Sequence, residues 1–193
     1  MAKLHTPTSP GRASMIGRSA PDVPRLPIRI FGTAGESIVD GPGMRYVIFV
    51  QGCPHDCLGC HNPESHDING GRLTDTAELW RDIGRYPLTS GVTFSGGEPF
   101  LWAHELASIG RAARGRGMNV MTYTGYLWEE LLEMAESDVG VRELLTVTNY
   151  LVDGPFVLEK RDLTLLYRGS GNQRILDITC YPNSRNAMPA FDR

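Results

Sequence analysis

The sequence predicts an α/β protein in which a parallel sheet with outer helices is coiled into an incomplete (βα) barrel. Apolar runs typical of strands alternate along the chain with segments whose apolar residues recur at helical spacing. Right-handed crossovers between parallel strands would curve such a sheet. A full barrel typically takes about 250 residues, and this chain has 193. We therefore expect fewer than the full set of βα units.

The strands are predicted from short apolar segments that end at turn-forming residues. A run of five apolar residues ends immediately before a loop of cysteines, and later runs precede glycine-rich turns. The predicted strands are residues 46–50, 91–95, 119–123, 149–153 and 175–178.

Helices are predicted between these strands. The first is capped by Thr74 or Asp75 and runs to residue 86. The second carries an apolar stripe and ends at a pair of glycines, and the third covers residues 127–136. The stripe of the second helix consists of Trp102, Leu106, Ile109 and Ala113.

The chain divides by composition into three parts. Residues 1–26 are rich in Ser, Pro and Arg, with Asp22 as their only acidic residue, and they lack the apolar core of a signal peptide. Their composition resembles a transit peptide, but the prolines would break an amphipathic helix, so a flexible extension is favoured. We expect one enzyme domain over residues 27–180 and a C-terminal tail over 181–193.

Charge and cysteine usage restrict the partners and the compartment. The net charge is −3 and no run of Lys or Arg is present, so neither nucleic acid nor an anionic membrane is an expected partner. No segment of the sequence has the composition of a membrane span. Three of the four cysteines are clustered, which favours a reducing compartment, and we expect a cytoplasmic protein.

The clustered cysteines, Cys53, Cys57 and Cys60, predict a metal centre. One short loop can turn three thiols toward a common point. Iron-sulfur clusters usually take four cysteine ligands, so a set of three leaves one iron open to a ligand that is not protein. A structural zinc site that adds His61 is an alternative, although adjacent Cys60 and His61 fit one ion poorly. A disulfide is less favoured, since it would leave an odd thiol.

The cysteines have the spacing Cys-x3-Cys-x2-Cys, and further motifs flank them in a fixed order. These are Val39-Asp-Gly-Pro-Gly-Met-Arg45, Ser95-Gly-Gly-Glu98, Tyr123-Thr-Gly-Tyr126, Leu151-Val-Asp-Gly-Pro-Phe156 and Arg168-Gly-Ser-Gly-Asn-Gln-Arg174. Over roughly residues 28–178, the chain thereby resembles the radical S-adenosylmethionine (SAM) enzymes, and among them the glycyl radical activases of anaerobic ribonucleoside-triphosphate reductases.

The resemblance implies a site and a mechanism. The three cysteines would be catalytic and would bind a 4Fe-4S cluster, SAM would chelate the open iron, and a reduced cluster would cleave SAM to give a 5′-deoxyadenosyl radical. The cofactor-binding residues that it implies are Gly59, Cys60, His61, Gly96, Gly97, Glu98 and Asp153. A side chain at Gly97 is expected to obstruct SAM and to spare the thiolates. For Asp153, a turn or helix-capping role is equally compatible with the sequence.

The resemblance also implies the partners. The substrate would be a glycine of an anaerobic ribonucleoside-triphosphate reductase, and a low-potential electron donor would reduce the cluster. Two alternatives remain open at this point: another radical SAM enzyme, either a pyruvate formate-lyase type activase or a small-molecule modifying enzyme, and a structural zinc or electron-transfer protein. Cys180 is not expected to be a ligand.

Overall fold

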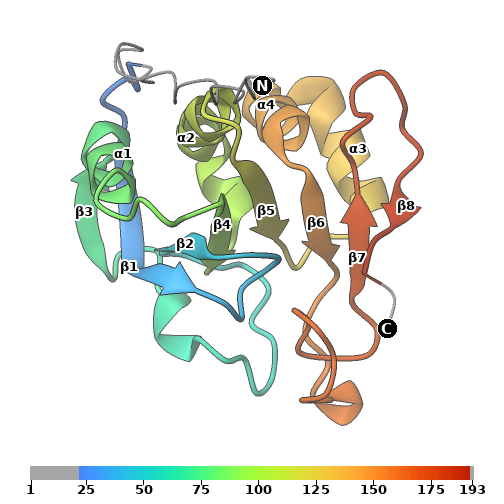
Figure 1. Ribbon diagram of the computed structural model, residues 1–193. Helices are drawn as coiled ribbons and strands as arrows, with labels where there is room; N and C mark the ends of the chain where they lie inside the picture. Colours follow the sequence, from blue (N-terminus) through green and yellow to red (C-terminus); the bar gives the residue numbers. More distant parts are fainter. Residues whose placement is uncertain (1–21, 192–193) are drawn as a thin grey trace, which may run out of the picture.

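The computed structural model describes residues 22–191, which form one mixed sheet with helices packed against it (Figure 1). The expected extension, residues 1–26, falls mostly outside the described residues. The strands are β1 (Pro27–Ser37), β2 (Arg45–Val50), β3 (Arg72–Asp75), β4 (Gly91–Gly96), β5 (Asn119–Tyr123), β6 (Tyr150–Asp153), β7 (Arg174–Asp177) and β8 (Met188–Pro189). The helices are α1 (Thr76–Ile83), α2 (Ala103–Gly115), α3 (Trp128–Ser137) and α4 (Val139–Val147).

The sheet has a parallel centre and antiparallel margins. Its order is β3-β1-β2-β4-β5-β6-β7-β8, and the neighbours from β2 to β6 are parallel. The α/β class and the four parallel strands were predicted correctly. The last predicted strand forms as β7, but it is antiparallel to β6. Strands β1, β3 and β8 and helix α4 were not predicted.

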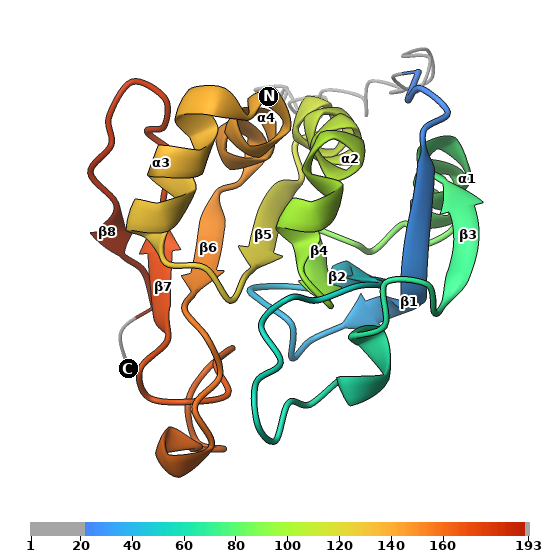
Figure 2. The ribbon, with the colours of Figure 1, turned by 180° about the vertical axis from the view of Figure 1, so that it is seen from behind.

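Helices α1 to α4 line one side of the sheet in the spatial order α1-α2-α4-α3, and each contacts its neighbours in that order (Figures 1 and 2). Side-chain oxygens satisfy free backbone amides at the starts of α1 and α4, as helix N-termini require. Asp75 accepts from the Glu78 amide at 2.7 Å to begin α1, and Asp138 accepts from the Val141 amide at 3.1 Å to begin α4. The expected cap of the first helix is therefore confirmed.

Alternate residues of the strands face two different environments, as the pleat requires. Val120 and Leu151 point toward the helices and belong to the main hydrophobic core. Met121, Val152 and Ile175 face the other side of the sheet, where they form a second, smaller cluster. The helix-free face of the described sheet is thus apolar at its centre.

Arg45 fills this helix-free face at the amino ends of β4 and β5. Its side chain is fully buried, and its guanidinium donates to the Thr93 hydroxyl at 2.5 Å and to the Asn119 side chain at 2.6 Å. Burial lowers its pKa to about 10. Arg45 therefore closes the amino-terminal end of the sheet interior and leaves only the carboxyl end open.

Segments beyond the expected domain boundaries also pack on the sheet. Val23 is buried in the main core, and the Thr76 hydroxyl donates to the Pro24 carbonyl. At the other end, β8 pairs with β7 and lengthens the sheet past residue 180. Across residues 22–191, the helices are all too short or too polar to span a bilayer.

Candidate active site

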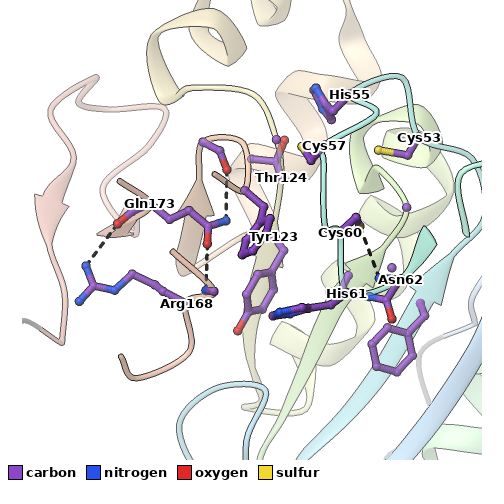
Figure 3. A pocket seen from close by; sticks show the side chains of 18 of the residues that line it. Cys53, His55, Cys57, Cys60, His61, Asn62, Tyr123, Thr124, Arg168 and Gln173 are labelled. Atoms are coloured by element: carbon purple, nitrogen blue, oxygen red, sulfur yellow. Dashed lines mark hydrogen bonds between the residues drawn. The ribbon is translucent and has the colours of Figure 1, made fainter. Parts of the chain in front are cut away.

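A cavity of about 440 Å³ opens at the carboxyl ends of the parallel strands (Figure 3). Carboxyl ends of parallel strands meet at one edge, so residues distant in sequence converge there. The cavity is lined by the cysteine loop after β2, the glycine turn after β4, the Thr-Gly-Tyr segment after β5 and Gly154 after β6. Segments that follow four different parallel strands therefore converge on one rim.

All three clustered cysteines line this cavity. Burial raises the pKa of the Cys53 thiol to about 11, so its thiolate needs compensating positive charge. A backbone amide already points at one of the sulfurs: the Asn62 amide donates to Cys60 Sγ at 3.4 Å. Within residues 22–191, no group of three potential ligands is arranged around a single ion.

The glycine turn is held against the start of the cysteine loop by backbone contacts. The Gly97 amide donates to the Val50 carbonyl at 2.8 Å, and the Glu98 amide donates to the Gly52 carbonyl at 2.7 Å. A β-carbon at Gly97 would lie 2.2 Å from that carbonyl oxygen. Only glycine fits at position 97, because a side chain there would collide with the backbone at the start of the cysteine loop. The expectation that a side chain at Gly97 would spare the thiolates is therefore corrected.

Glu98 lies behind the cavity wall. Its side chain is fully buried, and its carboxylate accepts from the Phe100 amide at 2.9 Å, from the Thr124 hydroxyl at 3.0 Å and from the Gly125 amide at 2.9 Å. His55 Nε2 lies 2.7 Å from the same carboxylate. The carboxylate that the sequence assigned to cofactor binding is thus occupied by four protein donors.

Asp153 also does not line the cavity. Its buried carboxylate accepts from the Trp128 amide at 2.8 Å and forms an ion pair with Arg174. The first contact begins α3, and the second joins β6 to β7. Of the two roles left open by the sequence, the geometry favours helix capping.

Asp153→Asn is therefore expected to lower the free energy of unfolding by about 1–3 kcal/mol, because it weakens a buried, charge-assisted set of hydrogen bonds. SAM affinity should be unchanged in the folded variant. Urea unfolding and SAM titration measure the two effects. Glu129→Gln, which changes the exposed partner of Arg174, should shift stability by less than about 1 kcal/mol. A stable Asp153→Asn protein that no longer bound SAM would restore the direct-contact role.

Of the remaining residues discussed from the sequence, some line the cavity and others do not. His61 lines the cavity, with its ring 5.2 Å from that of Phe156. Gly59 does not line it. Its φ of +74° allows the loop to turn between Cys57 and Cys60. Cys180 is exposed and also lies outside the lining.

The wall opposite the cysteines is formed by the loop between β6 and β7. Tyr167, Arg168, Gly169 and Gln173 line the cavity from this loop. Gln173 shapes the loop, since its side chain accepts from the Gly169 amide at 2.9 Å and donates to the Gly154 carbonyl at 3.2 Å (Figure 3). The sequence singled out residues 168–174 as a family motif rich in turn-forming residues, but it named none of them as a site residue.

Comparisons with known proteins agree with this geometry. The family described as "4Fe-4S single cluster domain" matches residues 39–176. The anaerobic ribonucleoside-triphosphate reductase-activating protein of Escherichia coli K12 is 31% identical over 144 residues, which cover 70% of this chain and 90% of that protein. The Vibrio cholerae protein of the same name is 34% identical, over 72% of this chain and 90% of that protein.

Two further similarities are less extensive. The pyruvate formate-lyase-activating enzyme of Clostridium pasteurianum is 36% identical over 114 residues, but these cover only 54% of this chain and 48% of that enzyme. The crystal structure of QueE from Escherichia coli aligns with a TM-score of 0.42 and 19% identity, over 51% of this chain and 52% of that one.

The matched residues 39–176 include the three thiols and nearly all of the cavity lining, so the protein is of the single-cluster 4Fe-4S class. Within that class, the chain belongs to the family of anaerobic ribonucleoside-triphosphate reductase-activating proteins.

Proposed function

We propose that this protein is a radical SAM activase that generates a glycyl radical on an anaerobic ribonucleoside-triphosphate reductase. The proposal is supported by the relatives that bear this name and by one observation above all. Three thiols and the backbone of a Gly-Gly turn line the same cavity at the carboxyl ends of the parallel strands. The open sheet, curved with its helices outside, would be the incomplete barrel of a radical SAM domain spanning residues 27–180.

Cys53, Cys57 and Cys60 would hold the cluster. Their donor set fits it, because three sulfurs face one cavity and Cys60 Sγ already accepts a backbone amide, as cluster-bound thiolates commonly do. Held by these residues, a reduced cluster would supply the single electron for cleavage of SAM to methionine and a 5′-deoxyadenosyl radical, which would take a hydrogen atom from the substrate.

The chain's own residues orient SAM and limit water. The backbone of Gly96 and Gly97 lines the cavity and would approach the amino acid part of SAM. Phe49, Tyr123 and Phe156 line the same cavity and would keep it largely dry. Glu98 and Asp153 would contribute indirectly, through the loops and the helix that they hold.

The substrate would be a glycine-bearing segment of the reductase, which gives up a hydrogen from its Cα. The cavity opens at the rim between the cysteine loop and the loop before β7, where such a segment can enter. A low-potential electron donor would reduce the cluster, and the reaction would take place in the cytoplasm.

The reconstituted, reduced protein with SAM is expected to produce the glycyl radical doublet in electron paramagnetic resonance (EPR) spectra of a cognate anaerobic reductase. It should produce none on pyruvate formate-lyase, because the match to that enzyme's activase covers less than half of it. Both proteins are offered in parallel, and SAM cleavage is quantified in each mixture. A radical on the lyase alone would contradict the proposal, and cleavage with neither radical would indicate a small-molecule substrate.

A further inference from the structure

The imidazole of His55 connects the cysteine loop to the buried carboxylate of Glu98. His55 lies midway between Cys53 and Cys57, and its Nε2 is 2.7 Å from Glu98 Oε2. The Glu98 side chain is fully buried, and the His55 side chain is 17% exposed. A short contact of this kind in a dry environment holds its two segments in a fixed relation.

Residues Thr124–Tyr126, which follow β5, surround this contact. Thr124 and Gly125 donate to the Glu98 carboxylate, and the ring of Tyr126 packs edge-on against His55 at 4.5 Å. A β-carbon at Gly125 would lie 2.4 Å from the imidazole ring. Each residue of the motif therefore has a defined contact with the His55–Glu98 pair.

The backbone of His55 lies within the cysteine loop, between the proposed ligands Cys53 and Cys57. Hydrogen bonds to ligand sulfurs and exclusion of solvent help to set the reduction potential of an iron-sulfur cluster. Fixing the imidazole thus also fixes the loop segment that joins two proposed ligands.

We infer that His55 is a positioning residue. By binding Glu98 beside the Thr124–Tyr126 segment, it holds the cysteine loop in register with the glycine turn. The inference rests on the proposed function only in taking the group bound by the three thiols to be a 4Fe-4S cluster.

His55→Ala removes the contact, while His55→Gln keeps a side-chain N–H donor of similar reach. In the reconstituted protein, we expect His55→Ala to retain iron against a chelator roughly tenfold less well, since lost supporting contacts weaken metal sites by about that factor or more. Its reduction potential should shift and its EPR signal should change, whereas His55→Gln should recover most of both properties. His104→Ala removes a His–Glu pair between α2 and α4, remote from the cavity, and should match the wild type.

Gly125→Ala gives an independent test. In the wild-type background, the new methyl group would displace the imidazole, so this variant should reproduce the iron loss of His55→Ala. In the His55→Ala background, the space is free and the same change should add almost nothing. Such non-additivity is expected only for groups in contact.

Amide hydrogen exchange of the apoprotein measures the contact without a cluster. Residues 53–60 should exchange faster in His55→Ala and in Gly125→Ala than in the wild type or in His104→Ala. Unchanged exchange together with unchanged potential in His55→Ala would overturn the inference, as would additive losses in the double variant. If the wild-type protein took up no cluster, the proposed function would fail, and the exchange measurement would still decide the role of His55.

Discussion

Alanine at Cys53, Cys57 or Cys60 is expected to reduce the iron content of the reconstituted protein to background and to abolish SAM cleavage. Two thiolates cannot replace the three that face the cavity, and within the described residues the remaining cysteine, Cys180, is exposed and lies outside the lining. Iron and sulfide analysis after anaerobic reconstitution, with the absorbance of the cluster, gives the result directly.

Cys180→Ala is the matched control and should bind as much iron as the wild type. The apoproteins of all four variants should unfold at nearly the same denaturant concentration, because none of these side chains belongs to the hydrophobic clusters. Retention of a normal cluster by the Cys57 variant would refute the ligand assignment, as would its loss from the Cys180 variant.

Gly97→Val is expected to impair cluster assembly and SAM binding together. The first atom of the new side chain would lie 2.2 Å from the Gly52 carbonyl oxygen. Gly52 directly precedes the proposed ligand Cys53. Overpacking against backbone costs about 1–3 kcal/mol and displaces the segment concerned. Both iron content and SAM affinity, measured on the same preparation, should therefore fall.

Gly32→Val provides the control for adding a branched side chain to a strand of this sheet. Gly32 lies in β1, and a β-carbon there meets no atom within 4 Å, so cluster and cofactor binding should persist. Normal iron content in Gly97→Val with loss of SAM affinity alone would mean that the glycine turn contacts the cofactor and leaves the cysteine loop undisturbed.

The sequence predicted the parts of the fold that repeat a βα pattern. Strands β2, β4, β5 and β6 and helices α1 to α3 were found because their apolar residues recur at strand or helix spacing. Strand β1 was missed because only Ile28 and Ile30 are fully buried in it, and its second half is polar and irregular in register. The direction of β7 could not be predicted, since a strand's own pattern is the same in either orientation.

The site was predicted well where chemistry depends on residue type, and poorly where it depends on three-dimensional contacts. Thiols and glycines after strands were identified from their spacing. Glu98 and Asp153 were assigned to the cofactor by resemblance to the family's motifs, yet both accept hydrogen bonds from amides far along the chain. Spacing along the sequence does not reveal such partners.

None of the three cysteines proposed to bind iron and sulfide belongs to either hydrophobic cluster. This bears on the order in which the protein folds and acquires its cofactor. In a zinc finger the metal supplies the folding free energy, whereas here a sheet with its layer of helices encloses an apolar core of its own. Glu98, Thr124 and Gly125, which receive His55, come together only after β4 and β5 have paired. The polypeptide should therefore fold first and acquire iron and sulfide afterwards, as a preformed acceptor for the cell's cluster-delivery machinery.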